Sequence, residues 1–270
     1  MKIEQRFTTH KIIKNAETNK ITFDCENMGT KHEFSVEQVL GFYLTKLKEF
    51  YAVSGIDMRE CVLTIPSYAS HVERQSLLDA AAIAGLRCPR IINESTAIAL
   101  RYGFFRQKDF VKEKPRKVAF VDFGHSKTTC TIAEFTPDKV KIICHHSERN
   151  LGARDFDYKV MQKLAAEFDK KHGDDPMESP RCKLRLMEAI EKARKTLSAD
   201  KEAQINVDYL LNEEDLNRNL KREEFEELVT PCLTRFREVL EETIVLSKLN
   251  IEEIEFVELL SDATRMPTIQ

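Results

Sequence analysis

The sequence predicts a mixed-sheet α/β fold, and two observations carry that prediction. Apolar runs of strand length alternate with amphipathic helical stretches along the chain, a pattern typical of α/β proteins. Within this alternation, three neighbouring strands follow one another through short turns, which predicts antiparallel hairpins. At 270 residues, with 42% hydrophobic and 32% charged residues, the chain suits one large or two modest globular domains.

The first fifty residues predict irregular strands followed by one long helix. Lys20 to Cys25 alternates in polarity as a strand does, and Asn27-Met28-Gly29 is a turn signal. Ser35 can cap the first turn of a helix, and Gln38 stands at the capping-box position. An apolar stripe at helical spacing follows, and Gly55 lies just beyond its end.

The next stretch alternates short strands and helices. Ser70 with Glu73 forms a second capping box. The expected elements are a strand from Cys61 to Ile65 stopped by Pro66, a helix from Ser70 to Gly85, a strand from Arg90 to Asn93, a helix from Thr96 to Tyr102 closed by Gly103, and a polar linker from Gln107 to Lys117.

The three hairpin strands come next, and the pattern after Gly152 becomes mainly helical. The strands are Val118 to Phe123, Thr128 to Phe135 and Lys139 to His146. The later elements are a helix from Asp155 to Lys171, a helix from Ser179 and Pro180 to about Ser198, a strand from Gln204 to Leu211, a helix from Leu220 to Leu249 broken or restarted near Pro231, and a strand from Ile254 to Leu260.

Charge and cysteine usage narrow the function classes. The formal net charge is -3, with basic and acidic residues interleaved, which gives no reason to expect a nucleic-acid or membrane partner. No apolar run reaches membrane-spanning length, and the start at Met1 does not resemble a signal peptide. The seven cysteines are scattered and never form CxxC, so neither a disulfide framework nor a zinc site is expected. These features predict a cytoplasmic protein.

The most informative local feature is an acid beside a tight turn. The strand from Val118 to Phe123 carries Asp122 at its end, and Gly124-His125-Ser126 follows. A carboxylate there can attract a metal ion next to backbone N–H groups that face a phosphate. From these residues alone, an ordinary β-hairpin whose Asp opens the turn is the favoured alternative.

Several segments of the chain, taken in order, carry a resemblance to a known family. They are Ile65 to Tyr68 with Arg74-Gln75, Asp79 to Ala81, Ile83 to Leu86 and Arg90 to Ala97; Val121 to Gly124; Leu151 to Asp157; Glu191 to Ser198; and Ala263 to Pro267. Together they resemble the nucleotide-binding domain of the seventy-kilodalton heat-shock chaperones. Gly124-His125-Ser126 and Asn150 to Asp157 resemble more closely the large, 110-kDa branch of that family, which is known mainly as nucleotide-exchange factors and holdase co-chaperones.

The resemblance implies an actin-like ATPase (ribonuclease H-like) fold with two lobes and mixed sheets, the first lobe incomplete. It also implies that the family's first phosphate loop and catalytic lysine have no counterpart before Met1, and that Gln270 precedes the helices completing the second lobe and the peptide-binding domains. The implied divisions are 1–110 for the partial first lobe, 111–151 and 231–270 for the core of the second lobe, and 152–230 for its outer subdomain.

By the same resemblance, the site holds ATP or ADP with Mg²⁺. Asp122 and Glu94 match positions near the magnesium ion and its water shell, and are the catalytic candidates; Glu94 could equally be a helix N-terminal acid. Five residues match the phosphate-binding part: Gly124, His125, Ser126, Lys127 and Gly152. Five match the nucleoside-binding part: Glu191, Arg194, Lys195, Ser198 and Arg265. The first four of these sit three or four residues apart on one helix face, which could also be an ordinary solvated face.

Two departures from the family pattern concern this site. Ser261-Asp262 replaces a Gly-Gly pair before Arg265, and a side chain forced to positive φ costs about 1 kcal/mol or more. His125 and Ser126 replace glycines of the phosphate turn, a change that the large branch shares and that implies slow hydrolysis. Weak or absent ATPase activity is therefore expected.

The leading hypothesis is a co-chaperone fragment that binds ATP or ADP and exchanges nucleotide on a 70-kDa heat-shock chaperone. Unfolded protein clients would be partners only of a longer chain. One alternative is an ATP-hydrolysing chaperone of the 70-kDa type, or more remotely a sugar kinase of the same fold. Another is a degenerate remnant that no longer binds nucleotide, which Ser261-Asp262 favours.

Overall fold

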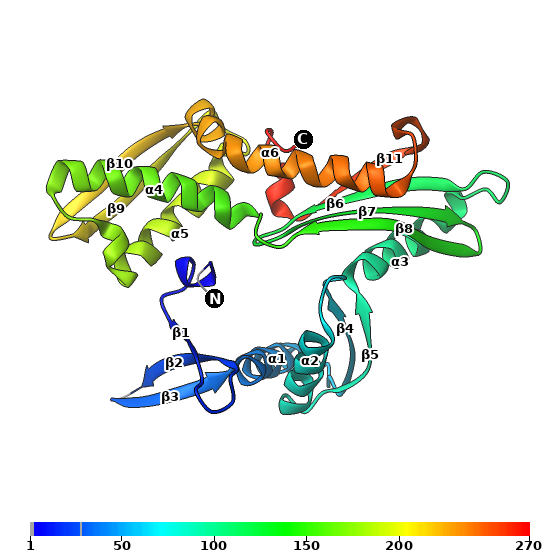
Figure 1. The fold of residues 1–270 in the computed structure, drawn as a ribbon, viewed down its shortest axis with the longest axis horizontal. Helices are drawn as coiled ribbons and strands as arrows, with labels where there is room; N and C mark the ends of the chain where they lie inside the picture. The colour runs from blue at the N-terminus through cyan, green and yellow to red at the C-terminus, as the bar shows by residue number, and fades with distance from the viewer. Residues whose placement is uncertain (1–2, 28) are drawn as a thin grey trace. The chain divides into compact units, whose positions relative to one another are not determined.

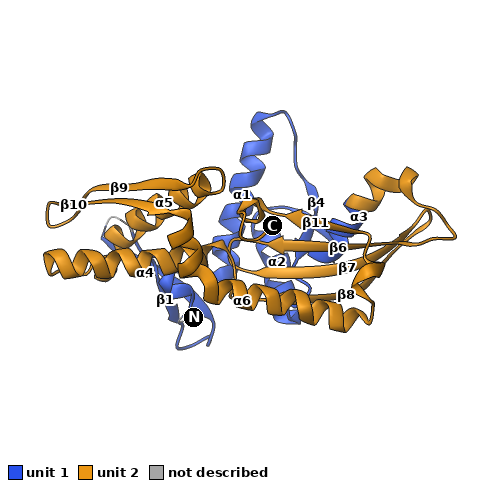
Figure 2. Cartoon of the chain, turned by 90° about the horizontal axis from the view of Figure 1, so that it is seen from above, with its two compact units in different colours: residues 1–101 blue, residues 102–270 orange. Residues whose placement is uncertain are grey.

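The computed structural model describes residues 3–27 and 29–270, and the chain divides into two compact units, residues 1–101 and 102–270 (Figure 2). Met1, Lys2 and Met28 lie outside the described residues, and with Met28 lies the centre of the turn expected at Asn27-Met28-Gly29. The mixed-sheet α/β class is confirmed, because parallel and antiparallel pairs occur together (Figure 1).

The first unit holds a three-stranded antiparallel sheet, a parallel strand pair and two helices packed on each other. Both expected capping boxes are present, Ser35 with Gln38 and Ser70 with Glu73. Its small core gathers Leu44, Leu86 and three alanines of α2 and its end. The elements are β1 (Lys11–Lys14), β2 (Ile21–Asn27), β3 (Thr30–Ser35), α1 (Val36–Val53), β4 (Glu60–Ile65), α2 (His71–Ile83), β5 (Arg87–Asn93) and α3 (Glu94–Arg106), whose last residues belong to the second unit.

The second unit is built on a four-stranded sheet in the order β11-β6-β7-β8, with a separate β10-β9 hairpin. β6, β7 and β8 pair antiparallel, whereas β11 joins β6 in parallel. The elements are β6 (Arg116–Phe123), β7 (Thr128–Thr136), β8 (Lys139–Glu148), α4 (Ala153–His172), α5 (Pro180–Leu197), β9 (Glu202–Leu211), β10 (Glu214–Lys221), α6 (Arg222–Ser247) and β11 (Phe256–Leu260).

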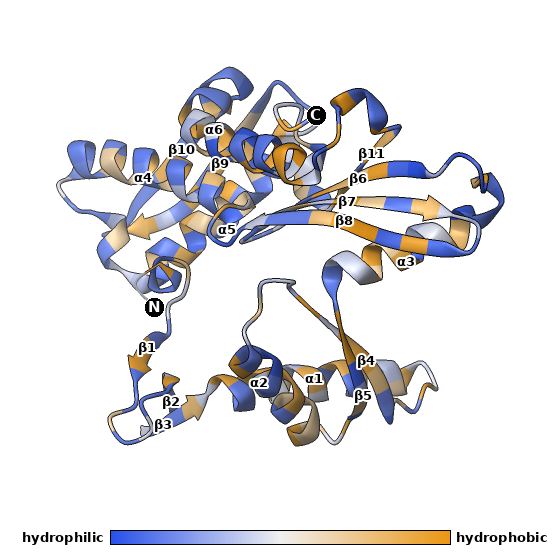
Figure 3. Ribbon diagram, turned by 45° about the vertical axis from the view of Figure 1, so that its right-hand side comes forward, coloured by the Kyte–Doolittle hydropathy of each residue, from blue (hydrophilic) through white to orange (hydrophobic). Residues whose placement is uncertain are grey.

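Burial of apolar surface holds the central strands in place. β6 and β7 are buried over most of their length, and Figure 3 shows hydrophobic stretches along them. α6 packs on β7 and β8. At the end of β6, the ring of Phe123 lies 5.0 Å from that of Phe156 on α4 and 5.4 Å from that of Phe236 on α6. This aromatic cluster fixes the start of α4 against the end of β6, where the predicted phosphate turn begins.

Two expectations near the unit boundary were wrong. Gly103 does not end α3, which continues to Arg106, because Gly103 lets the helix pack closely on the sheet. A Cβ there would lie 3.1 Å from Val140 and 3.3 Å from Phe135. The polar stretch from Gln107 to Lys117 is not a plain linker, since Phe110 is buried with its ring stacked 5.2 Å from that of Phe135.

The region after β9 also differs from expectation. Residues Glu214–Lys221 form a strand that was not predicted, because only Leu216 and Leu220 of it are buried. α6 therefore starts at Arg222, and it runs unbroken through Pro231, which faces solvent. The last strand starts at Phe256, after a short 3₁₀ turn, rather than at Ile254.

Candidate nucleotide-binding site

The turn between β6 and β7, residues 124–127, is closed by its own backbone. The Gly124 N–H donates to the Lys127 carbonyl at 2.9 Å, just beyond the Phe123–Thr128 pair of the ladder. Asp122 lies two residues before it, and a Cβ on Gly124 would lie 3.9 Å from the Asp122 Oδ1. We call residues 124–127 the β6–β7 turn. It brings the acid and four predicted phosphate-site residues together.

The start of α4 clamps this turn. The Ala153 N–H donates to the Gly124 carbonyl and the Arg154 N–H to the His125 carbonyl, both at 3.0 Å. Gly152 lies flat against the turn, since a Cβ there would come within 2.5 Å of the His125 carbonyl group and 2.6 Å of the Ser126 N. No real side chain fits in that space, so Gly152 is required by the close approach.

The clamp also decides where the turn's donors point. No described peptide bond is cis, and in a trans peptide the C=O and N–H groups point in opposite directions. Because the carbonyls of Gly124 and His125 face α4, the N–H groups of His125 and Ser126 face away from it. Adjacent N–H groups directed to one side form a typical anion-binding surface. The turn can thus donate two hydrogen bonds to one anion.

The end of β11 touches the same turn from another side. Ser261 has φ +76° and ψ 160°, so the expected positive φ at this position is confirmed. Its hydroxyl donates to the Phe123 carbonyl, and the Thr264 hydroxyl donates to the Ser261 carbonyl at 2.7 Å. Farther along, Arg265 pairs with Asp262 at 3.4 Å, and both side chains are exposed.

The predicted nucleoside-binding residues on α5 divide between two environments. Lys195 pairs with Glu191 at 2.7 Å on the exposed side, and the Ser198 hydroxyl donates to the Lys195 carbonyl at the helix end. The hydrogen bond from Lys195 lowers the pKa of Glu191. α5 packs on α4, and the first residues of α4 bond to the β6–β7 turn, so α4 links the turn to α5.

Arg194 lies on the buried side instead. Its guanidinium donates two hydrogen bonds to Asp157 of α4, at 2.6 and 3.1 Å, and the two side chains are only 7% and 3% exposed. Burial raises the pKa of Asp157, and Arg194 opposes that shift. Asp157 was not among the residues predicted for the site. Its position on the apolar face of α4, between Phe156 and Val160, was the available signal, since a buried carboxylate needs a cation.

Glu94 and Asp122, the predicted magnesium pair, belong to different units. Glu94 is the first residue of α3 in the first unit, and Asp122 lies on β6 in the second. Their shared role stays a prediction. Within residues 3–27 and 29–270, no group of three or more His, Cys, Asp or Glu side chains could hold a metal ion. Asp122 still fits Mg²⁺, which often uses one or two carboxylates together with substrate phosphates.

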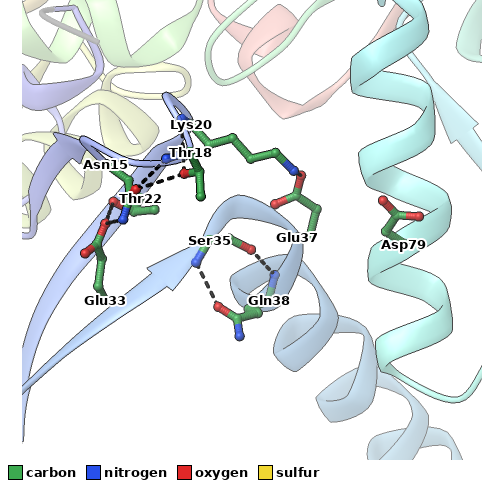
Figure 4. A pocket seen from close by; sticks show the side chains of 9 residues that line it. All are labelled: Asn15, Thr18, Lys20, Thr22, Glu33, Ser35, Glu37, Gln38 and Asp79. Carbon is green, nitrogen blue, oxygen red and sulfur yellow. Dashed lines mark hydrogen bonds and ion pairs between the residues drawn. The ribbon is translucent and has the colours of Figure 1, made fainter.

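A polar cavity of about 500 Å³ in the first unit contains none of the predicted site residues. Figure 4 shows its side chains bonded to one another: Glu33 accepts from Thr22, and Lys20 pairs with Glu37. The lining therefore ties the β1–β3 sheet to α1. The full lining is Asn15, Thr18, Lys20, Thr22, Glu33, Ser35, Glu37, Gln38 and Asp79.

Glu37 should make this connection sensitive to acid. Its own backbone N–H at the start of α1 contributes most to lowering its pKa to about 2, with smaller help from Ser35, Ser76 and Lys20. Because the pKa of Glu37 is lower in the folded than in the unfolded protein, its ionised form stabilises the fold at pH values above the unfolded-state pKa. This stabilisation is lost as the pH falls toward the folded-state pKa. We expect Glu37→Gln to reduce the free energy of unfolding at pH 7 by about 2 kcal/mol.

Urea unfolding followed by circular dichroism checks this expectation at pH 7 and at pH 3. The difference between the parent and Glu37→Gln should shrink as pH falls from 4.5 toward 2. Glu49→Gln, on the same helix but 59% exposed, is the matched control and should differ little from the parent at either pH. A Glu37→Gln effect of equal size at both pH values would contradict the proposed ionisation.

Comparison with known proteins places this chain in a family. The family model described as Hsp70 protein matches residues 1–270. The chain belongs to the Hsp70 family. Among its relatives, this Hsp70-family chain is 35% identical over 269 residues to a heat shock protein homolog of Saccharomyces cerevisiae, covering 99% of this chain and 39% of the relative.

Two further relatives extend the comparison to plants and another fungus. Identity is 37% over 243 residues to heat shock 70 kDa protein 16 of Arabidopsis thaliana, covering 90% of this chain and 32% of the relative. It is 34% over 272 residues to heat shock protein hsp88 of Neurospora crassa, covering 99% and 38%. This Hsp70-family chain thus spans between 32% and 39% of the length of these relatives.

These findings confirm the resemblance to the large branch of the family and the actin-like ATPase fold. The family's ATPase domain binds nucleotide with Mg²⁺. In the described part of the chain, no helix has the length and apolar character needed to span a membrane.

Proposed function

We propose that this chain binds ATP or ADP with Mg²⁺ at the β6–β7 turn and promotes nucleotide exchange on a 70-kDa heat-shock chaperone. The observation that carries the proposal is the direction of the His125 and Ser126 N–H groups, fixed by the two hydrogen bonds from α4. Both N–H groups can donate to one phosphate without any rearrangement of the turn.

The other predicted residues have roles around that contact. Asp122 would hold Mg²⁺, which neutralises phosphate charge when bound, and the magnesium role of Glu94 stays a prediction from the family resemblance. Lys127 adds a positive charge within the turn. The nucleoside would lie against the exposed side of α5, through Glu191 and Lys195, with Ser198 at the helix end and Arg265 on the other side of the nucleoside. Arg194, on the buried side, would support this helix through its bonds to Asp157 of α4.

Exchange is favoured over hydrolysis because His125 and Ser126 occupy the turn in place of glycines. The names of the relatives, all heat-shock proteins, support a chaperone context. We place the activity in the cytoplasm, and reserve unfolded clients for a longer protein. We also retain 152–230 as an outer subdomain of the second lobe, with 111–151 and 231–270 as its core and 1–110 as part of the first lobe.

The proposal is tested in two stages on the same folded sample. In the first, saturating Mg-ADP at about 100 times Kd should raise the melting temperature by several degrees. In Asp122→Ala, the part of the rise in melting temperature that depends on magnesium should be lost. Asp138→Ala, which removes an exposed acid from the β7–β8 turn, is the matched control and should keep the rise.

In the second stage, the release of a fluorescent ADP analogue from a 70-kDa chaperone is followed by stopped flow. Micromolar parent chain should accelerate release, and so should Asp138→Ala. If release from the chaperone is unchanged in the presence of folded protein, the exchange function is wrong. A magnesium-dependent turnover of ATP by the chain alone would instead favour the ATPase alternative.

A further inference from the structure

We propose that Ser261 is a positioning residue that holds the β6–β7 turn in its anion-binding shape. The backbone of Ser261 has a conformation that is unusual for a serine. With φ +76° and ψ 160°, Ser261 lies in a region that is essentially reserved for glycine. The other described non-glycine residues with positive φ, such as Tyr209 and Lys248, have values between 47° and 64°. A serine keeps such a conformation only where its surroundings hold it there.

The bonds at both ends of Ser261 supply that constraint. Its hydroxyl donates to the carbonyl of Phe123, and its own carbonyl accepts from the buried hydroxyl of Thr264. The neighbouring residue Leu260 pairs with Asp122 in the parallel β11–β6 ladder. The strained residue is therefore fixed to β6 through its side chain and to the 262–265 segment through its backbone.

The Phe123 carbonyl is the last one before the turn. Phe123 itself is fully buried, and the next peptide unit belongs to Gly124, whose carbonyl accepts from α4. The turn thus has an anchor at each side: α4 holds the carbonyls of Gly124 and His125, and Ser261 holds the carbonyl of Phe123. A glycine at position 261 would relax the backbone but would leave the second anchor without its donor.

Two substitutions separate the effect of the Ser261 hydroxyl from the effect of the backbone strain. Ser261→Ala removes the hydroxyl donor but keeps a Cβ at positive φ, so the strain remains. Ser261→Gly removes the hydroxyl donor and also the Cβ, so the strain is relieved. We expect Gly124 N–H exchange with solvent to be about fivefold faster in both variants, because the turn opens more often. Thr234→Ala, which removes an exposed helical hydroxyl from α6, is the matched control and should leave this exchange unchanged.

The ligand-dependent half of the test rests on the proposed nucleotide binding. Affinity for Mg-ADP, measured by calorimetry, should weaken about fivefold in both variants. Their melting temperatures should diverge, with Ser261→Gly more stable than Ser261→Ala because the strain is gone. A purely structural role would make affinity follow stability, so that Ser261→Gly binds better than Ser261→Ala.

The outcomes are distinguishable. The positioning role is overturned if the Gly124 N–H of Ser261→Ala exchanges with solvent at the parent rate. It is also overturned if Ser261→Gly binds Mg-ADP with the parent affinity. If the parent does not bind Mg-ADP, the proposed function fails, but the rates of Gly124 N–H exchange with solvent still decide whether Ser261 holds the turn. Faster Gly124 N–H exchange in both Ser261 variants, with Thr234→Ala unchanged, supports the positioning role whether or not Mg-ADP binds.

Discussion

Substitution of Gly152 by alanine is expected to abolish nucleotide binding and to lower the free energy of unfolding of the second unit by about 3 kcal/mol. The added Cβ would lie 2.5 Å from the His125 carbonyl carbon and oxygen, which are backbone atoms and cannot turn aside. The start of α4 would have to retreat from the turn. Its two hydrogen bonds to the Gly124 and His125 carbonyls would lengthen or break, and the turn's N–H groups would lose their common direction.

Gly173→Ala is the matched control, at the other end of the same helix. Gly173 has φ +82° and nothing within 4 Å of an added Cβ, so only backbone strain of about 1 kcal/mol is expected. Urea unfolding gives the stabilities, and calorimetry with Mg-ADP gives the affinities. Equal effects of the two substitutions would show that the close approach at Gly152 does not matter.

The second large effect concerns the buried pair of Asp157 and Arg194. Arg194→Met leaves a carboxylate that is 3% exposed without its cation, and we expect a loss of about 3 to 5 kcal/mol in the free energy of unfolding. The double variant Asp157→Leu with Arg194→Met removes both charges. It should recover most of that loss, because two desolvated charges are replaced by apolar contacts.

Urea unfolding of the parent, Arg194→Met and the double variant gives the three free energies of unfolding that test this expectation. The comparison pair is Glu191→Gln with Lys195→Met, an exposed ion pair on the same helix, for which less than about 1 kcal/mol is expected. A double variant as unstable as Arg194→Met would contradict the expected coupling. Mg-ADP affinity of the recovered double variant then tells whether Arg194 also contacts the nucleoside.

Local signals in the sequence predicted the elements that are fixed by local chemistry. The capping boxes at Ser35 and Ser70 and the start of α5 at Pro180 depend on residues within one turn of each other, so they were correct. β10 was missed because its sequence is mostly polar and its strand character comes from pairing with β9. Gly103 was misjudged because its role is set by Val140 and Phe135, which no local pattern connects to it.

The candidate site shows the same division. The sequence itself indicated the turn and its acid at Asp122 and Gly124, and the resemblance indicated Gly152. The direction of the turn's N–H groups could not be predicted, because it depends on hydrogen bonds from α4. The burial of Arg194 was missed since its helix face is decided by Asp157, 37 residues earlier in the chain.

The parallel pairing of β11 with β6 also determines when the site can form during folding. The hairpins of β6, β7 and β8 close through short loops and can form early. The bond between Ser261 and Phe123 joins residues 138 apart, so the chain must close a long loop before it exists. We expect the turn to reach its final shape only after α4, α5 and α6 have folded. Nucleotide binding would then report the completion of the second unit rather than its nucleation.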